Sequence, residues 1–94
     1  MNYRTLAGQV ALVTGAGSSL GIGHACARAL CDGGATVVVT STTDRIHERV
    51  AELTAQRWNA IGLVAGLMQP GAADRLVADA VALAGRLDIV VNNA

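Results

Sequence analysis

The sequence predicts an α/β protein: the N-terminal part of a doubly wound, parallel-sheet (Rossmann-type) fold with about four strands and three helices. Short runs of apolar, mostly β-branched residues alternate with longer segments of helical periodicity, and a glycine-rich turn follows the first run. The chain has no Phe, one Trp and one Tyr, so its core must consist of small aliphatic side chains. Such a core suits helices that pack closely on a sheet through right-handed crossovers.

The first strand is expected at residues 10–14, where a short apolar run ends at the glycine-rich turn. Helical spacing of apolar residues then predicts a helix from Gly21 to about Asp32, which Gly33 and its neighbouring glycine terminate. Residues 36–40 read Thr-Val-Val-Val-Thr and are β-branched throughout. This composition predicts a second, buried strand.

A second helix is expected after several N-cap candidates in residues 41–44. Its apolar stripe is Ile46, Val50 and Leu53, and the pattern fades near residues 58–59. The charged side chains of this helix are expected on its outward face: Arg45, Glu48, Arg49 and Glu52.

The third strand is predicted at residues 60–64, although Gly62 weakens that strand pattern. Residues from Pro70 to about Gly85 show one apolar helical face and predict the third helix. Residues 87–91 predict the fourth strand, which leads into Asn-Asn-Ala. We expect this strand to form an uncovered apolar edge, through which the chain would self-associate.

The composition excludes several classes of protein. Seven basic and seven acidic residues give zero net charge, so the chain lacks the basic patch that a nucleic-acid-binding protein needs. No run of about 18 apolar residues predicts a membrane span. Cys26 and Cys31 lie in one predicted helix, where they cannot pair, and no metal-ligand pattern includes them. These features predict reduced thiols and a cytoplasmic protein without a metal site.

The turn of residues 14–23, Thr-Gly-Ala-Gly-Ser-Ser-Leu-Gly-Ile-Gly, lies between a predicted strand and a predicted helix. In that context Gly15 allows a sharp turn, Gly21 allows close approach of a ligand, and Gly23 allows the helix to pack tightly on the sheet. Amides at the helix N-terminus favour a pyrophosphate. The plain alternative is a flexible connection without a ligand. A P-loop is excluded because the chain contains no lysine.

With these residues the sequence resembles the short-chain dehydrogenase/reductase family of NAD(P)-dependent oxidoreductases. Five turn residues match its Thr-Gly-x-x-x-Gly-Ile-Gly motif, in a loop two residues longer: Thr14, Gly15, Gly21, Ile22 and Gly23. The terminal Asn92-Asn93-Ala94 is similar to the family's Asn-Asn-Ala-Gly. The resemblance implies that Ser18 and Ser19 donate to the cofactor pyrophosphate, that Asn92 braces neighbouring strands, and that Ala94 lies near the adenosine ribose.

The end of the second predicted strand indicates which dinucleotide is bound. An NAD site commonly has an acidic residue there, but this chain has Ser41 and Thr42, followed by Arg45. Hydroxyls and a nearby cation favour NADP over NAD. Arg45 is equally well read as a solvated charge, and His24 either approaches the same phosphate or is a half-exposed helix residue. Gly66 stands where the family usually carries an Asp near the adenine.

Catalytic residues are not expected within these residues. The family's acid–base pair is a tyrosine and a lysine four residues later, whereas Tyr3 is the only tyrosine and lysine is absent. We therefore expect residues 1–94 to be the N-terminal part of an NAD(P)-binding domain, cut after Asn-Asn-Ala. The alternatives are a non-catalytic nucleotide-binding or oligomerisation module and a methyltransferase, the latter disfavoured by the neutral residues 40–42.

Overall fold

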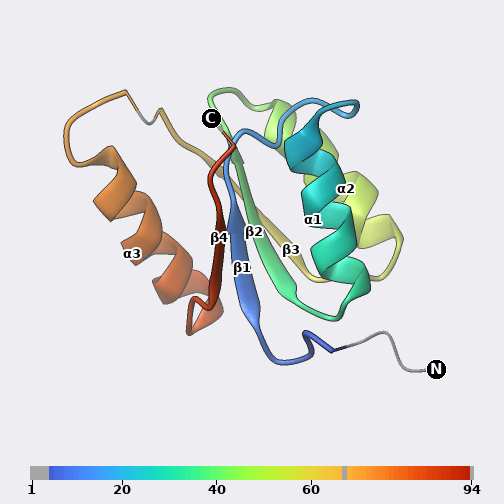
Figure 1. The fold of residues 1–94 in the computed structure, drawn as a ribbon. Helices are drawn as coiled ribbons and strands as arrows, with labels where there is room; N and C mark the ends of the chain where they lie inside the picture. The colour runs from blue at the N-terminus through green and yellow to red at the C-terminus, as the bar shows by residue number, and fades with distance from the viewer. Residues whose placement is uncertain (1–4, 67, 94) are drawn as a thin grey trace.

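The computed structural model describes residues 5–66 and 68–93, in which strands and helices alternate along the chain (Figure 1). The elements are β1 (Val10–Val13), α1 (Ile22–Asp32), β2 (Thr36–Ser41), α2 (Arg45–Ala55), β3 (Ala60–Val64), α3 (Ala72–Ala84) and β4 (Ile89–Val91). The predicted fold class is confirmed, because four parallel strands form one sheet with three helices around it.

The strand order of the sheet is β3-β2-β1-β4, and every pairing is parallel. Leu12 at the centre of β1 is level with Val38 of β2 and Val90 of β4. The chain first moves outward from β1 to β3, then crosses back to place β4 on the other side of β1. The carboxyl ends of β1 and β4 therefore flank the point at which the direction of winding reverses, where open α/β sheets bind their ligands.

Helices cover both faces of the sheet, α1 and α2 on one face and α3 on the other (Figure 1). Side chains of β1 alternate between the two layers, as the pleat of a strand requires. Ala11 and Val13 belong to the cluster with α1 and α2, whereas Val10 and Leu12 pack with Leu76 of α3. Burial on both faces explains why β1 is apolar without interruption.

Several boundaries differ from those predicted by one residue or more, and the structure shows what accompanies the change at two of them. The helix α2 ends at Ala55, before the expected residues 58–59, because Arg57 adopts a left-handed conformation with φ 64°. The strand β4 begins at Ile89, after the expected residue 87. Asp88 precedes it and bonds to Val10 twice: its N–H donates to the Val10 carbonyl, and its carboxylate accepts the Val10 N–H, each at 2.8 Å.

The strand β4 lies at the edge of the sheet and pairs with β1 alone within residues 5–66 and 68–93. Val90 on this strand is 56% exposed, and Leu83 of α3 is 54% exposed. The predicted apolar edge is therefore present. Over the same described residues, no helix has the length and apolar character needed to cross a membrane.

Candidate nucleotide-binding site

The glycine-rich turn leaves β1 at its carboxyl end and is fastened to both neighbouring strands. Thr14 donates its N–H to the carbonyl of Val91 at 3.1 Å, and Ala16 donates to the carbonyl of Thr40 at 2.8 Å. Gly15 between them has φ 65°, a left-handed conformation that glycine adopts without strain. A Cβ atom on Gly15 would also collide with the backbone carbonyl of Asn93. The first residues of the turn are thus fixed to β2 and β4.

The segment after β4 packs directly against the turn. The Thr14 hydroxyl accepts the Asn93 N–H at 3.0 Å and donates to Asn92 Oδ1 at 3.2 Å. Asn93 Nδ2 donates to the carbonyl of Gly15 at 3.3 Å. The glycine-rich turn and the Asn92-Asn93 segment therefore form one hydrogen-bonded unit.

Gly23 is the point of closest approach between α1 and this unit. A Cβ atom there would lie 2.5 Å from the Gly15 carbonyl oxygen and 2.9 Å from Asn93 Nδ2. The atoms nearest to this position belong to Gly15 and Asn93, which lie just beyond the carboxyl ends of β1 and β4. Gly17 makes an equally close approach that was not anticipated, since its Cβ would lie 2.8 Å from Cβ of Ser41.

A cavity of about 390 Å³ opens beside the turn, at the carboxyl ends of β1, β2 and β3. Its volume is within the range of small-molecule sites. The lining residues are Gly15, Gly17, Ser18, Thr40, Ser41, Thr42, Thr43, Arg45, Ala65 and Met68.

The structure brings together only part of the predicted site. Four of the candidate residues line the cavity: Gly15, Ser18, Ser41 and Thr42. Five others lie in the turn, in the first turn of α1 or after β4, and are not among the lining residues: Ser19, Gly21, Ile22, Gly23 and Asn92. Ala94 is outside the described residues.

The polar groups around the cavity suit an anion. Arg45, the first residue of α2, is exposed and is the charged member of the lining, which includes no carboxylate among the described residues. The Ser41 hydroxyl donates to the Thr43 carbonyl at 2.6 Å, which orders the backbone between β2 and α2. Amides at the start of α1, after the N-cap Gly21, add positive potential.

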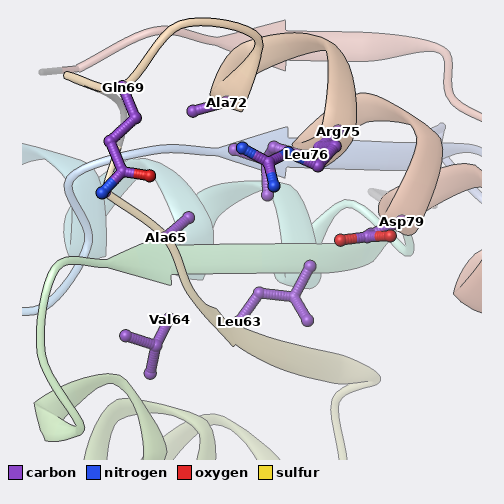
Figure 2. Close-up of a pocket in the computed structure, with 9 residues that line it drawn as sticks. Leu63, Val64, Ala65, Gln69, Ala72, Arg75, Leu76 and Asp79 are labelled. Carbon is purple, nitrogen blue, oxygen red and sulfur yellow. The ribbon is translucent and has the colours of Figure 1, made fainter.

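A second cavity of about 250 Å³ lies between β3 and α3. Figure 2 shows Leu63 and Val64 on the strand side, Arg75 and Asp79 on the helix side, and Gln69 between the two elements. Ala65 lines both cavities. Gly66 also lines this second cavity. Because glycine has no side chain, Gly66 presents only backbone atoms to it.

A charged cluster beneath the turn was not foreseen. Arg49, predicted to point outward, has a side chain only 12% exposed: its Nη2 lies 2.6 Å from Glu52 Oε2, and its Nη1 donates to the Gly17 carbonyl at 3.4 Å. His24 is 4% exposed, so the prediction of a half-exposed helix residue was wrong, and His24 is not among the residues that line the cavity. Its Nε2 lies 3.9 Å from Glu52 Oε1.

Burial is the main cause that lowers the pKa of His24 below its ordinary value of 6.5. Glu52 opposes this shift, while Arg28 and Arg49 add to it. His24 is therefore neutral at pH 7, next to an ion pair between Arg49 and Glu52. The spacing of these two residues on α2 suggests such a pair, but the contact of Arg49 with the turn depends on how α2 packs.

Comparison with known proteins is consistent with this geometry. The family model described as "short chain dehydrogenase" matches residues 9–94. The human protein Dehydrogenase/reductase SDR family member 4 is 43% identical over 90 residues, which cover 95% of this chain and 32% of that protein.

Solved structures of short-chain dehydrogenases and oxidoreductases also match nearly the whole of this chain. A short chain dehydrogenase from Mycobacterium smegmatis superposes with a TM-score of 0.92 at 35% identity, over 99% of this chain and 39% of that one. A metagenomic short-chain oxidoreductase in complex with NADP gives a TM-score of 0.87 at 37% identity, over 96% of this chain and 40% of that one. The chain thus spans 32–40% of the length of these relatives.

Proposed function

The chain belongs to the short-chain dehydrogenase family, and from that premise we propose that its glycine-rich turn and the adjoining cavity bind the adenosine and pyrophosphate portion of a nicotinamide dinucleotide. The observation that carries the proposal is the cavity itself. It joins the hydroxyl-rich segment after β2 to the turn at Gly15 and Ser18, and this turn follows β1, one of the two strands that flank the reversal point of the sheet.

Each part of the ligand has residues suited to it. The pyrophosphate would lie at the turn and the start of α1, held by the segment that contains Gly15, Ser18, Ser19, Gly21, Ile22 and Gly23. The ribose would lie by Ser41 and Thr42. Asn92 would act indirectly, by bracing Thr14 through the hydrogen bond of 3.2 Å, with Ala94 beside the adenosine ribose.

We further propose that the dinucleotide is NADP in preference to NAD. Arg45 and the hydroxyls of Ser41 and Thr42 line the cavity, and no carboxylate of a described residue lies among them to repel an additional phosphate. A guanidinium is well suited to phosphate, because it offers paired donors in a fixed plane. The NADP complex of the metagenomic relative supports this choice by analogy.

The reaction of the whole protein is proposed from the family: hydride transfer between NADP(H) and an alcohol or ketone. The 94 residues contain no lysine and a single tyrosine, so they do not include the family's tyrosine–lysine pair. We assign no catalytic residue here. The proposed location is the cytoplasm, where the free thiols of Cys26 and Cys31 would remain reduced.

Titration calorimetry with NADP, NAD and adenosine tests the binding proposal. We expect saturable binding of both dinucleotides, tighter for NADP, and weaker binding of adenosine, which lacks the pyrophosphate. Gly21→Val should remove dinucleotide binding in a variant that keeps its helical circular dichroism. Binding of none of the three ligands by the folded chain would refute the proposal.

A second candidate function is association through the β4 edge, favoured by the exposed Val90 on an edge strand. Sedimentation velocity tests whether the chain self-associates through this edge. A self-associating chain would show a concentration-dependent shift toward a dimer that Val90→Lys removes. A monomer at all concentrations would eliminate self-association while leaving the nucleotide proposal intact.

A further inference from the structure

The cluster of Arg49, Glu52 and His24 lies where α1, α2 and the glycine-rich turn meet; the side chains of Arg49 and His24 are 12% and 5% exposed, whereas that of Glu52 is 40% exposed. Arg49 makes two of the contacts in this cluster: an ion pair of 2.6 Å to Glu52 and a hydrogen bond of 3.4 Å to the carbonyl of Gly17. Arg49 does not line the cavity, whereas Arg45, one helical turn earlier on α2, does. The two arginines of α2 thus lie at different places relative to the ligand site.

The bond from Arg49 fixes the orientation of a peptide group that borders the cavity. No peptide bond between described residues is cis, so the Gly17 carbonyl and the Ser18 N–H point in opposite directions across their shared peptide plane. With the carbonyl turned toward Arg49, the Ser18 N–H is turned away from it. Gly17 and Ser18 both line the cavity, and no backbone carbonyl of a described residue accepts that N–H.

We propose that Arg49 is a positioning residue for the pyrophosphate: it holds the Gly17 carbonyl away from the anion and thereby presents the Ser18 amide to it. This inference rests on the proposed function of the turn. Without Arg49 the peptide is free to rotate, and a carbonyl oxygen directed at the cavity would repel a phosphate. Glu52 fixes the other edge of the guanidinium, so the planar fork of Arg49 is used on two sides.

The surrounding charges explain why the cluster orients the peptide group between Gly17 and Ser18 and does not itself attract the phosphate. Glu52 neutralises Arg49, and Glu48 lies 4.0 Å from the same Nη2 atom. His24, which faces Glu52, is kept neutral by burial, which lowers its pKa. The cluster therefore presents little net positive charge to a ligand, and its effect must come from the hydrogen bond.

The test uses two ligands that each contain part of NADP. ADP-ribose contains the pyrophosphate but no phosphate on the adenosine 2′-hydroxyl, whereas adenosine 2′-phosphate contains that phosphate but no pyrophosphate. We expect Arg49→Met to weaken ADP-ribose binding about tenfold, the effect of losing one charge-assisted hydrogen bond, and to leave adenosine 2′-phosphate binding unchanged. Arg45→Met should give the reverse pattern.

Arg28→Met is the matched control. It removes the same charge from α1, beside His24, but its guanidinium lies over the ring of Trp58 at 5.5 Å and does not contact the turn. Equal loss of ADP-ribose affinity in Arg28→Met and Arg49→Met would show a simple charge effect and overturn the inference. An unchanged ADP-ribose affinity in Arg49→Met would also overturn it.

Two cases remain: the Arg49→Met variant does not fold, or the unsubstituted chain does not bind the ligands. If Arg49→Met does not fold, Arg49→Lys keeps the charge without the planar fork, and an ADP-ribose affinity equal to that of the unsubstituted chain would contradict positioning. If the unsubstituted chain binds neither ADP-ribose nor NADP, the proposed function fails and the inference fails with it. Normal binding that is insensitive to residue 49 contradicts the inference alone.

Discussion

The hydroxyl of Thr14 accepts the backbone N–H of Asn93 at 3.0 Å, across 79 positions of the chain. The same hydroxyl donates to Asn92 Oδ1 at 3.2 Å, and Thr14 is only 4% exposed. One buried side chain thus fixes the start of the glycine-rich turn to the end of β4. The geometry of the candidate site therefore depends on a contact between two segments that lie far apart in the sequence.

Thr14→Val should destabilise the chain by about 1–3 kcal/mol, because valine keeps the shape of threonine but leaves the Asn93 N–H without its acceptor. Urea denaturation measures the loss as a lower midpoint. Thr54→Val is the matched control, since Thr54 is exposed and bonds only to carbonyls of its own helix at 3.0 and 3.2 Å. Equal midpoints for the two variants would contradict the bracing role of Thr14.

Gly23→Ala should also destabilise the chain, by about 1–3 kcal/mol of overpacking. The added methyl would lie 2.5 Å from the Gly15 carbonyl oxygen, and backbone cannot move aside easily. This cost exceeds the gain of up to about 1 kcal/mol that alanine has over glycine in a helix. Gly66→Ala is the control, because no atom lies within 4 Å of the position that its Cβ would occupy. A thermal midpoint for Gly23→Ala at or above that of the unsubstituted chain would refute the close packing.

The sequence was sufficient to predict the sheet because local pattern and burial agree in its strands. Val37, Val38 and Val39 are β-branched and fully buried, so propensity and packing favour the same structure. The turn was also predictable, since Gly15 has the positive φ that its position requires. The ends of the elements were predicted less accurately where the conformation of a single residue decides them, as the left-handed conformation of Arg57 does after α2.

The sequence could not reveal contacts between helices and the turn. Helical periodicity assigned Arg49 to the outward face, but α2 packs so closely on β3 that a Cβ on Gly62 would lie 2.7 Å from Val50. That close packing, together with the short distance between Gly17 and Ser41, brings Arg49 against the turn. The burial of His24 has the same origin, because α1 meets α2 at that point.

Thr42→Asp should shift the proposed preference from NADP toward NAD. Thr42 and Arg45 line the same cavity, so a carboxylate there would repel the additional phosphate and pair with the arginine that attracts it. We expect the ratio of NADP to NAD affinity to fall at least about tenfold in calorimetric titrations, a difference of about 1.4 kcal/mol. Ala51→Asp adds the same charge on α2 outside the cavity and should leave the ratio unchanged. A ratio that Thr42→Asp does not alter would remove Thr42 from the selective contacts.

His24 should make the stability of the chain depend on pH in the weakly acidic range. Burial lowers the pKa of His24 in the folded chain below 6.5, so the folded state resists a proton that the unfolded state accepts. Stability is therefore complete above pH 6.5, falls as the pH decreases below it, and stops falling from this cause once the pH has passed the lowered folded pKa. Urea midpoints measured between pH 8 and pH 5 should show this decrease, and His24→Gln should flatten it. His47→Gln removes the exposed imidazole on α2 and should leave the decrease in place. An identical pH profile for the unsubstituted chain and His24→Gln would show that His24 is not the group responsible.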